Sequence, residues 1–217
     1  MNRKIYLLVS IIAMFFIHSE SFGQHLIGTE LTYTNIGQDS FMIKLVFYRD
    51  CNEINTGNAR IRIICKTTGQ NIATVSITKP PAVDITPICS SGCSRCQTSS
   101  CSFPYGIEKY QYEKLVVLNT TCCELILFHQ ECCRNNAITT GAKSKFFFNE
   151  ATLNRCITPQ NSSPVFRTDP HTLLCKGQDH WINVGAIDPN GDSLVYEFAY
   201  PLEGHGSNIS YSGQYDY

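Results

Sequence analysis

Apolar and polar residues alternate in short runs along the middle of the chain, which is the pattern of half-buried β-strands. In the clearest run, Ile61, Ile63 and Cys65 fall on one face, and Arg60, Arg62 and Ile64 fall on the other. Other runs are rich in branched and aromatic residues, which favour strands; they span 30–34, 41–48, 71–78, 111–118 and 146–151. The chain after residue 23 has no long amphipathic helix pattern. The sequence therefore predicts an all-β fold, an antiparallel sandwich or barrel.

Two stretches interrupt this rhythm. Residues 79–110 contain four prolines and four cysteines among serines and threonines. A loop this long is normally functional or disordered, and here cross-links can order it without a core of its own. The polar stretch 159–163 is rich in turn residues and marks a boundary. Strands are predicted again at 164–166, 181–184 and 194–198, and no strand pattern follows residue 204. We therefore expect one domain over 24–160 and an incomplete module over 161–217, in a chain that is a fragment.

The N-terminus has the pattern of a secretory signal peptide. Arg3 and Lys4 precede an apolar run over 5–17, and Ser21 and Gly23 supply the small residues that a signal peptidase reads. The run is too short to span a bilayer, and no later stretch is long and apolar enough. We therefore expect the export machinery to cleave the chain after Gly23, and the mature protein, residues 24 onward, to be secreted or on the cell surface.

The charge balance gives no indication of a nucleic-acid partner. The whole chain has 17 basic and 18 acidic residues. Removal of residues 1–23 takes away Arg3, Lys4 and Glu20, which leaves 15 and 17 and changes the formal net charge from −1 to −2. We expect neither a phosphate backbone nor an anionic lipid surface as partner.

An even number of cysteines behind a signal peptide predicts a disulfide framework, whose connectivity one sequence does not give. The spacing Cys89-x3-Cys93-x2-Cys96-x4-Cys101 also fits four thiolates around zinc, but an exported chain with no histidine nearby favours disulfides. The twelve cysteines are Cys51, Cys65, Cys89, Cys93, Cys96, Cys101, Cys122, Cys123, Cys132, Cys133, Cys156 and Cys175.

Two adjacent cysteine pairs bound the apolar run 124–131. If 122–133 is one strand, Cys122 and Cys132 lie on one face, and Cys123 and Cys133 lie on the other. The two ends of such a strand are about 33 Å apart, so they cannot bridge each other. We expect each of these four cysteines to pair with another segment and to act as a structural cross-link rather than as a redox pair.

The stretch Asp188-Pro189-Asn190-Gly191-Asp192 has two interpretations. Oxygen ligands on Asp188, Asn190 and Asp192 have a spacing that can surround calcium. The same residues make an ordinary type I turn between strands. The positions of glycine and of the following residues exclude an EF-hand, and the turn alone is the slightly favoured interpretation.

Catalytic signatures are not found: the chain has no nucleophile elbow, zinc-protease helix, phosphate loop or dinucleotide fingerprint. The histidines stand singly, and a lone His129 in a strand is expected to be a packed or surface residue. We therefore predict that the protein is not an enzyme and has no catalytic residues.

Several segments together resemble the N-terminal region of large secreted, adhesin-like surface proteins of gliding bacteria. The most specific segments are YRDCN at 48–52 and CCRNNAIT at 132–139. The resemblance also includes LTY at 31–33, FNEATLN at 148–154 and NSSPVF at 161–166, and the segments occur in the same order as in those proteins. AIDPNGDSLVY at 186–196 is similar to the start of cadherin-like and immunoglobulin-like bacterial repeats. Such proteins usually end in a gliding-motility-associated C-terminal domain, so the resemblance also leads us to expect that the chain is a fragment.

The resemblance implies a disulfide-rich β-sandwich followed by a partial immunoglobulin-like or cadherin-like module, with calcium carried over only to Asp188, Asn190 and Asp192. It implies adhesion or a structural role at the surface, with an extracellular protein or polysaccharide as partner. We expect the cysteine-rich loop to be the binding surface, with Tyr105, Tyr110 and Tyr112 as contact residues unless they belong to the core. The alternative is an accessory or carbohydrate-binding region of a secreted hydrolase.

The redox state of the cysteines can be tested by the intact mass of the exported protein before and after reduction and alkylation. A disulfide framework predicts removal of residues 1–23 and a loss of about twelve hydrogens in the unreduced form, one per cysteine. Free thiols in half of the cysteines, together with co-purifying zinc, would instead support the metal site.

Overall fold

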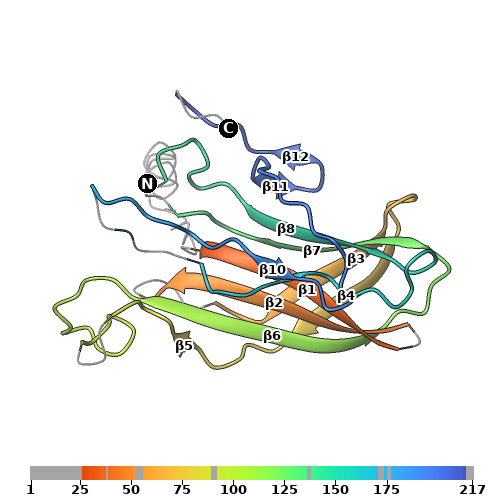
Figure 1. The fold of residues 1–217 in the computed structure, drawn as a ribbon, viewed down its shortest axis with the longest axis horizontal. Coiled ribbons are helices and arrows are strands. Elements are labelled where there is room, and N and C mark those ends of the chain that lie inside the picture. The colour runs from red at the N-terminus through yellow and green to blue at the C-terminus, as the bar shows by residue number, and fades with distance from the viewer. Residues whose placement is uncertain are drawn as a thin grey trace, which may run out of the picture.

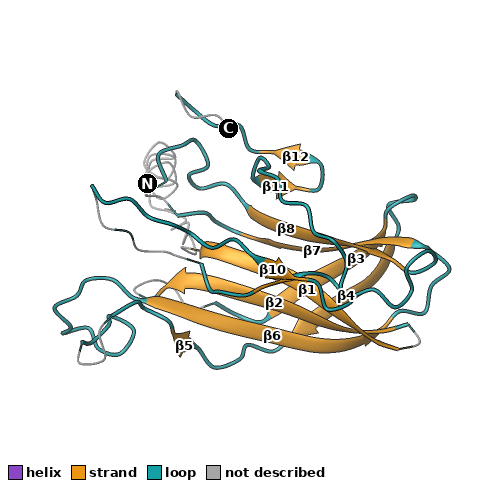
Figure 2. Ribbon diagram, in the orientation of Figure 1, coloured by secondary structure: helices purple, strands orange, loops and turns teal. Residues whose placement is uncertain are grey.

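Two four-stranded antiparallel sheets form the body of the molecule (Figures 1 and 2). The structure is a computed structural model that describes residues 26–37, 39–51, 56–88, 92–135, 138–170, 174 and 177–213. The predicted signal peptide, residues 1–23, lies outside this range. The first sheet has the order β1-β2-β6-β5, and its strands are β1 (Leu26–Gly37), β2 (Ser40–Asp50), β6 (Ile107–Val117) and β5 (Val83–Asp84). The second has the order β4-β3-β7-β8, with β4 (Asn71–Ile77), β3 (Ala59–Cys65), β7 (Glu124–Glu131) and β8 (Phe147–Asn154).

The predicted all-β, antiparallel and disulfide-containing fold class is confirmed. The strand order is that of an immunoglobulin-type sandwich, because β1-β2-β6-β5 corresponds to strands A-B-E-D and β4-β3-β7-β8 to C′-C-F-G. The sequence led us to expect an immunoglobulin-like module after residue 161. The structure builds this strand order from the residues before it.

The core lies between the sheets and is made by the inward positions of the alternating runs. Ile61 and Ile63 of β3 are fully buried, as the alternation predicted. On β2, Ile43, Leu45 and Phe47 point inward in the same way and are buried. Full burial of such a side chain contributes about 1.5–3 kcal/mol. The sandwich is therefore held by an apolar interior to which both sheets contribute.

The chain after β8 lies on the edges and outer faces of the sandwich instead of forming a second core. The backbone of Tyr33 in β1 exchanges hydrogen bonds with Ser163, from Tyr33 N to Ser163 Oγ (2.8 Å) and from Ser163 N to Tyr33 O (2.9 Å). Ser162 Oγ accepts a third bond from Asn35 N (3.1 Å). The predicted linker at 159–163 is therefore attached to the edge of β1, where it covers backbone groups that an edge strand would otherwise expose.

Two short two-stranded ladders follow: β9 (Val165–Phe166) with β10 (Ala186–Ile187), and β11 (Leu202–Gly204) with β12 (Ser207–Asn208). Figure 1 shows β10 in front of the first sheet and β11 beside β8. Leu202 packs against a small cluster formed by Ile126, Phe128 and Phe148. The strands predicted at 181–184 and 194–198 are wrong, because in the described structure these segments join no ladder. The division of the chain at residue 160 stays a prediction.

The residues that the structure describes include no helix that is long and apolar enough to cross a membrane.

The contribution of the core can be tested with two leucines on neighbouring strands of one sheet. Leu45 is 0% exposed and Leu115 is 50% exposed. We expect Leu45→Ala to lower the free energy of unfolding by about 2–5 kcal/mol, because it leaves a cavity. Leu115→Ala should change it by less than about 1 kcal/mol. Urea unfolding of the oxidised protein measures both values, and equal losses would contradict the placement of the core.

Candidate functional site

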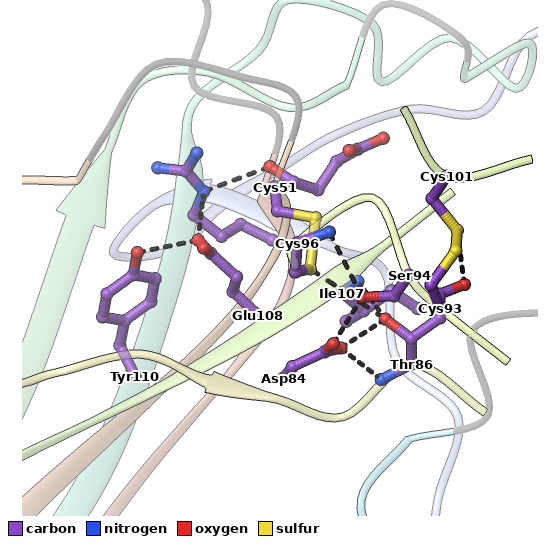
Figure 3. Close-up of a disulfide and its surroundings, with 12 residues drawn as sticks. Cys51, Asp84, Thr86, Cys93, Ser94, Cys96, Cys101, Ile107, Glu108 and Tyr110 are labelled. Carbon is purple, nitrogen blue, oxygen red and sulfur yellow. Dashed lines mark hydrogen bonds and ion pairs between the residues drawn. A yellow bond between two sulfur atoms is a disulfide. The ribbon is translucent and has the colours of Figure 1, made fainter. Parts of the chain in front are cut away.

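One disulfide fixes the cysteine-rich loop to the end of the first sheet, and a second closes the loop on itself (Figure 3). Cys51, directly after β2, is bonded to Cys96, and their Cα atoms are 5.2 Å apart. Cys93 is bonded to Cys101 within the loop. The preference for disulfides is confirmed at Cys93, Cys96 and Cys101, and the zinc alternative is wrong for these three residues. Cys89 lies outside the described residues.

Gly106 lets the backbone approach the Cys51–Cys96 disulfide closely, just before β6 begins. A Cβ atom at Gly106 would overlap Cys51 Sγ, and it would lie 2.7 Å from Cys96 Sγ and 2.8 Å from Cys96 N. The backbone pairs at the same point, because Cys51 N donates to Gly106 O (3.2 Å). A residue with a side chain therefore cannot occupy this position without displacing the disulfide.

Asp84 of β5 connects the loop to the sheet through its carboxylate. Oδ1 accepts hydrogen bonds from Thr86 N (3.0 Å) and Thr86 Oγ1, and Oδ2 accepts one from the fully buried Ser94. Burial acts to raise the pKa of Asp84, but these hydrogen bonds outweigh it and hold the pKa below its usual value. The carboxylate is thus engaged in holding the loop and is not a free acid or base.

Three further pairs lie around β7. Cys122 is bonded to Cys65 at the end of β3, and Cys123 is bonded to Cys156 after β8. The expectation that each cysteine pairs with another segment is confirmed for these two. It is wrong for the pair that follows β7, because Cys132 and Cys133 are bonded to each other.

The physical reason for this exception is that the strand does not reach 133. β7 ends at Glu131, so the period-two geometry that would place Cys132 and Cys133 on opposite faces of a strand no longer applies. The last predicted half-cystine, Cys175, lies outside the described residues.

The three tyrosines predicted as contact residues have different environments. Tyr105 is 53% exposed and lies in the loop, whereas Tyr110 and Tyr112 are buried in the core. The expectation of an exposed tyrosine surface is therefore wrong for Tyr110 and Tyr112, and the core interpretation holds for them. Both have the inward orientation of alternate β6 residues, and burial raises the pKa of both, to about 12 for Tyr110.

The phenol groups of the two buried tyrosines find partners at one end of the sandwich. Tyr110 Oη donates to Glu108 Oε2 (2.7 Å), as Figure 3 shows, and Glu108 also pairs with the buried Arg49. Tyr112 Oη donates to Gly57 O (2.9 Å). The histidine predicted to be a packed or surface residue, His129, is buried on β7, with Nδ1 2.8 Å from Arg60 O. Each of these hydroxyl groups, and Nδ1 of His129, thus has a partner within the sandwich.

The turn at 188–192 uses its side chains within the protein. Asp188 Oδ1 accepts hydrogen bonds from Asn190 N (2.8 Å) and Asp192 N (3.3 Å), which is the pattern of an Asx turn. Asn190 Oδ1 accepts one from Ser162 N (2.8 Å), so this turn also holds the segment attached to β1. In the described ranges no group of three or more His, Cys, Asp or Glu side chains could hold a metal. The geometry favours the turn, and calcium stays a prediction.

A hollow of about 260 Å³ lies between β1 and residues 166–170 and 182–184. We call it the Glu30 pocket. One side is Glu30 of β1, and the other is formed by polar and apolar residues of the crossing segment. Its lining residues are Glu30, Phe166, Thr168, Asp169, Pro170, Ile182, Asn183 and Val184. The hollow is smaller than the sites that hold drug-sized ligands and has room for a side chain.

The floor of the Glu30 pocket is a hydrogen-bond network on the outer face of the first sheet. Tyr48 of β2 is 2% exposed, and its Oη lies 2.9 Å from Glu30 Oε1 and 3.1 Å from Asp169 Oδ1. Lys109 of β6 forms an ion pair with Asp169. Burial, and then the hydrogen bonds to the two carboxylates, raise the pKa of Tyr48 strongly, so it remains a neutral donor.

Comparison with protein-family models, with curated proteins and with solved structures finds no match to this chain. The resemblance to adhesin-like proteins of gliding bacteria therefore stays a prediction.

Sequence reasoning missed the Glu30 pocket, because its acidic groups come from separate parts of the chain. Glu30 and Asp169 are 139 positions apart, and the tyrosine that joins them lies on a third segment. The one available signal was Tyr48 at the end of the strand predicted at 41–48, because Lys109 lies before the strand predicted at 111–118. That signal gives no reason to connect Tyr48 with residue 169.

The close approach at Gly106 can be tested by adding one methyl group. We expect Gly106→Ala to lower the free energy of unfolding by about 1–3 kcal/mol, because the methyl group overlaps the Cys51–Cys96 disulfide. Gly57→Ala is the control, because no atom lies within 4 Å of a Cβ there, and it should change stability by less than about 0.5 kcal/mol. Thermal unfolding and a count of free thiols measure both effects. An unchanged Gly106→Ala protein would contradict the geometry.

Proposed function

We propose that this chain is an extracellular protein that acts in adhesion or surface structure by binding and without catalysis. The observation that carries the proposal is a disulfide-braced sandwich with large apolar side chains exposed on the segment attached to it. Five cysteine pairs at disulfide distance among the described residues indicate an oxidising environment. Residues 1–23 support export to the outside of the cell or to its surface.

The exposed apolar residues support a binding role. Trp181 is 96% exposed, Phe198 89% and Val195 83%, and all three lie on the part of the chain that follows the attachment at Ser163. Exposure of large apolar side chains costs solubility and, where they gather, is typical of interaction surfaces. Tryptophan is also among the residues that contribute most to binding energy at interfaces. This stretch therefore supports a contact surface better than the buried Tyr110 and Tyr112 do.

The bracing of the cysteine-rich loop fits the same role. A loop that is preorganised loses little conformational entropy when it binds, so more of its contact energy appears as affinity. The exposed Tyr105 lies in this loop, next to Phe103 at a ring-centroid distance of 5.7 Å. The loop offers a second contact region, which depends on the disulfides for its shape.

The proposal can be tested with the oxidised protein lacking residues 1–23, labelled and added to intact cells of the producing organism. We expect saturable binding that is lost after reduction and alkylation. Trp181→Ala should weaken the binding several-fold without a change in Tm. Ile157→Ala, at another exposed apolar residue (81% exposed), should leave it unchanged.

Treating the cells before binding separates adhesion from the alternative function. Binding that disappears when the surface proteins are digested supports a protein partner. Binding only to isolated polysaccharide, with release of reducing sugar when a catalytic domain is attached, would support the accessory region of a hydrolase. Absence of saturable binding to both would overturn the proposed function.

A further inference from the structure

The Glu30 pocket has more negative charge than its protein partners compensate. Glu30 and Asp169 each contribute one negative charge, and Lys109 supplies one positive charge through its ion pair with Asp169. Tyr48 has a single phenolic proton, yet its Oη lies within hydrogen-bond distance of both carboxylates. Among the described residues the carboxylates thus share two donor groups, and an excess of one negative charge remains in the pocket.

Apart from Thr168 and Asn183, the rest of the pocket wall is apolar and partly open. Phe166 is 51% exposed, Ile182 50% and Val184 60%, and Pro170 completes this side. The wall itself is held in place, because Thr168 Oγ1 donates to Asn183 O (3.3 Å) and the β9–β10 ladder joins its two halves. An occupant must therefore combine an apolar body with a cationic, hydrogen-bond-donating end.

We propose that the Glu30 pocket binds the side chain of a lysine on a protein partner, with its ammonium group at Glu30 and its aliphatic stem along Phe166, Ile182 and Val184. This inference rests on the proposed adhesive function and names the chemistry of its partner. Charged hydrogen bonds to carboxylates are the strong ones, and lysine stems pack readily along apolar surface. An anion would be repelled, and a neutral hydroxyl compound would leave the charge uncompensated.

Glu30 is the residue that distinguishes this site from the structural network beneath it. Its Oε1 accepts the hydrogen bond from Tyr48, and it has no ion pair with any residue that the structure describes. Asp169, in contrast, is already paired with Lys109. Glu30→Gln removes the charge and keeps an oxygen that accepts from Tyr48, so the floor of the pocket can remain folded.

The test uses n-butylammonium, which has the length and charge of a lysine side chain, and n-butanol as the neutral probe. Backbone amide shifts of the oxidised protein are followed during each titration. We expect saturable shifts at Asn183 and Val184 with n-butylammonium only, weakened by added salt. Glu30→Gln should weaken this binding about tenfold or more, because a charged hydrogen bond is lost.

Glu113→Gln is the matched control, since Glu113 is an exposed carboxylate on β6 of the same sheet. It should bind n-butylammonium like the unmodified protein, and both variants should keep the Tm and the absence of free thiols. The inference is overturned by an absence of saturable shifts, by equal binding of n-butanol, or by unchanged binding in Glu30→Gln.

The cell-binding experiment keeps the two proposals separate. If Glu30→Gln reduces cell binding and Glu113→Gln does not, the pocket is part of the adhesive contact. If n-butylammonium binds as expected but the protein does not bind cells, the adhesive function fails and the lysine-type pocket stands. In the third outcome, the unmodified protein and both variants bind cells equally, and none of them binds n-butylammonium. The pocket inference then fails and the adhesive function stands.

Discussion

The hydrogen bonds between Ser163 and Tyr33 determine where the last quarter of the chain lies. They attach the chain to the edge of β1 directly after β8. From this point residues 164–170 and 177–187 lie over the outer face of the first sheet (Figure 1), which brings Asp169 to Tyr48 and Lys109. Asn190 then returns to bond Ser162, so both ends of the crossing are held at the same place. Without this attachment the Glu30 pocket would have only one wall.

The strands of the sandwich could be predicted because their alternation matches one buried face. Ile61 and Ile63 are buried and Arg60 and Arg62 are exposed, as a period of two requires. The same pattern failed at 181–184 and 194–198, where apolar residues alternate but no neighbouring strand supplies backbone partners in the described structure. Alternation shows that a segment is able to form a strand. Pairing into a sheet also requires a neighbouring strand, which the pattern of one segment does not identify.

The candidate sites were harder to predict, because each joins residues that are distant in sequence. The cysteine spacing predicted disulfides, but the partner of Cys96 is Cys51, 45 positions away, and only the fold brings the two together. The tyrosines near the loop illustrate the opposite problem. Tyr105 and Tyr110 are close in sequence, yet the start of β6 at Ile107 places the first outside and the second in the core.

The disulfides of this sandwich lie at different positions from the disulfide of antibody domains, and this affects which parts of the molecule they hold rigid. Antibody domains join strands B and F through the core, whereas the equivalent strands here, β2 and β7, meet through Phe47 and His129, with ring centroids 4.9 Å apart. The cysteines are bonded instead at the ends of strands and within loops. Apolar packing thus holds the sheets together, and the covalent bonds are available to fix the loops. A scaffold of this kind can present rigid loops and an attached segment to a partner while its core stays unchanged.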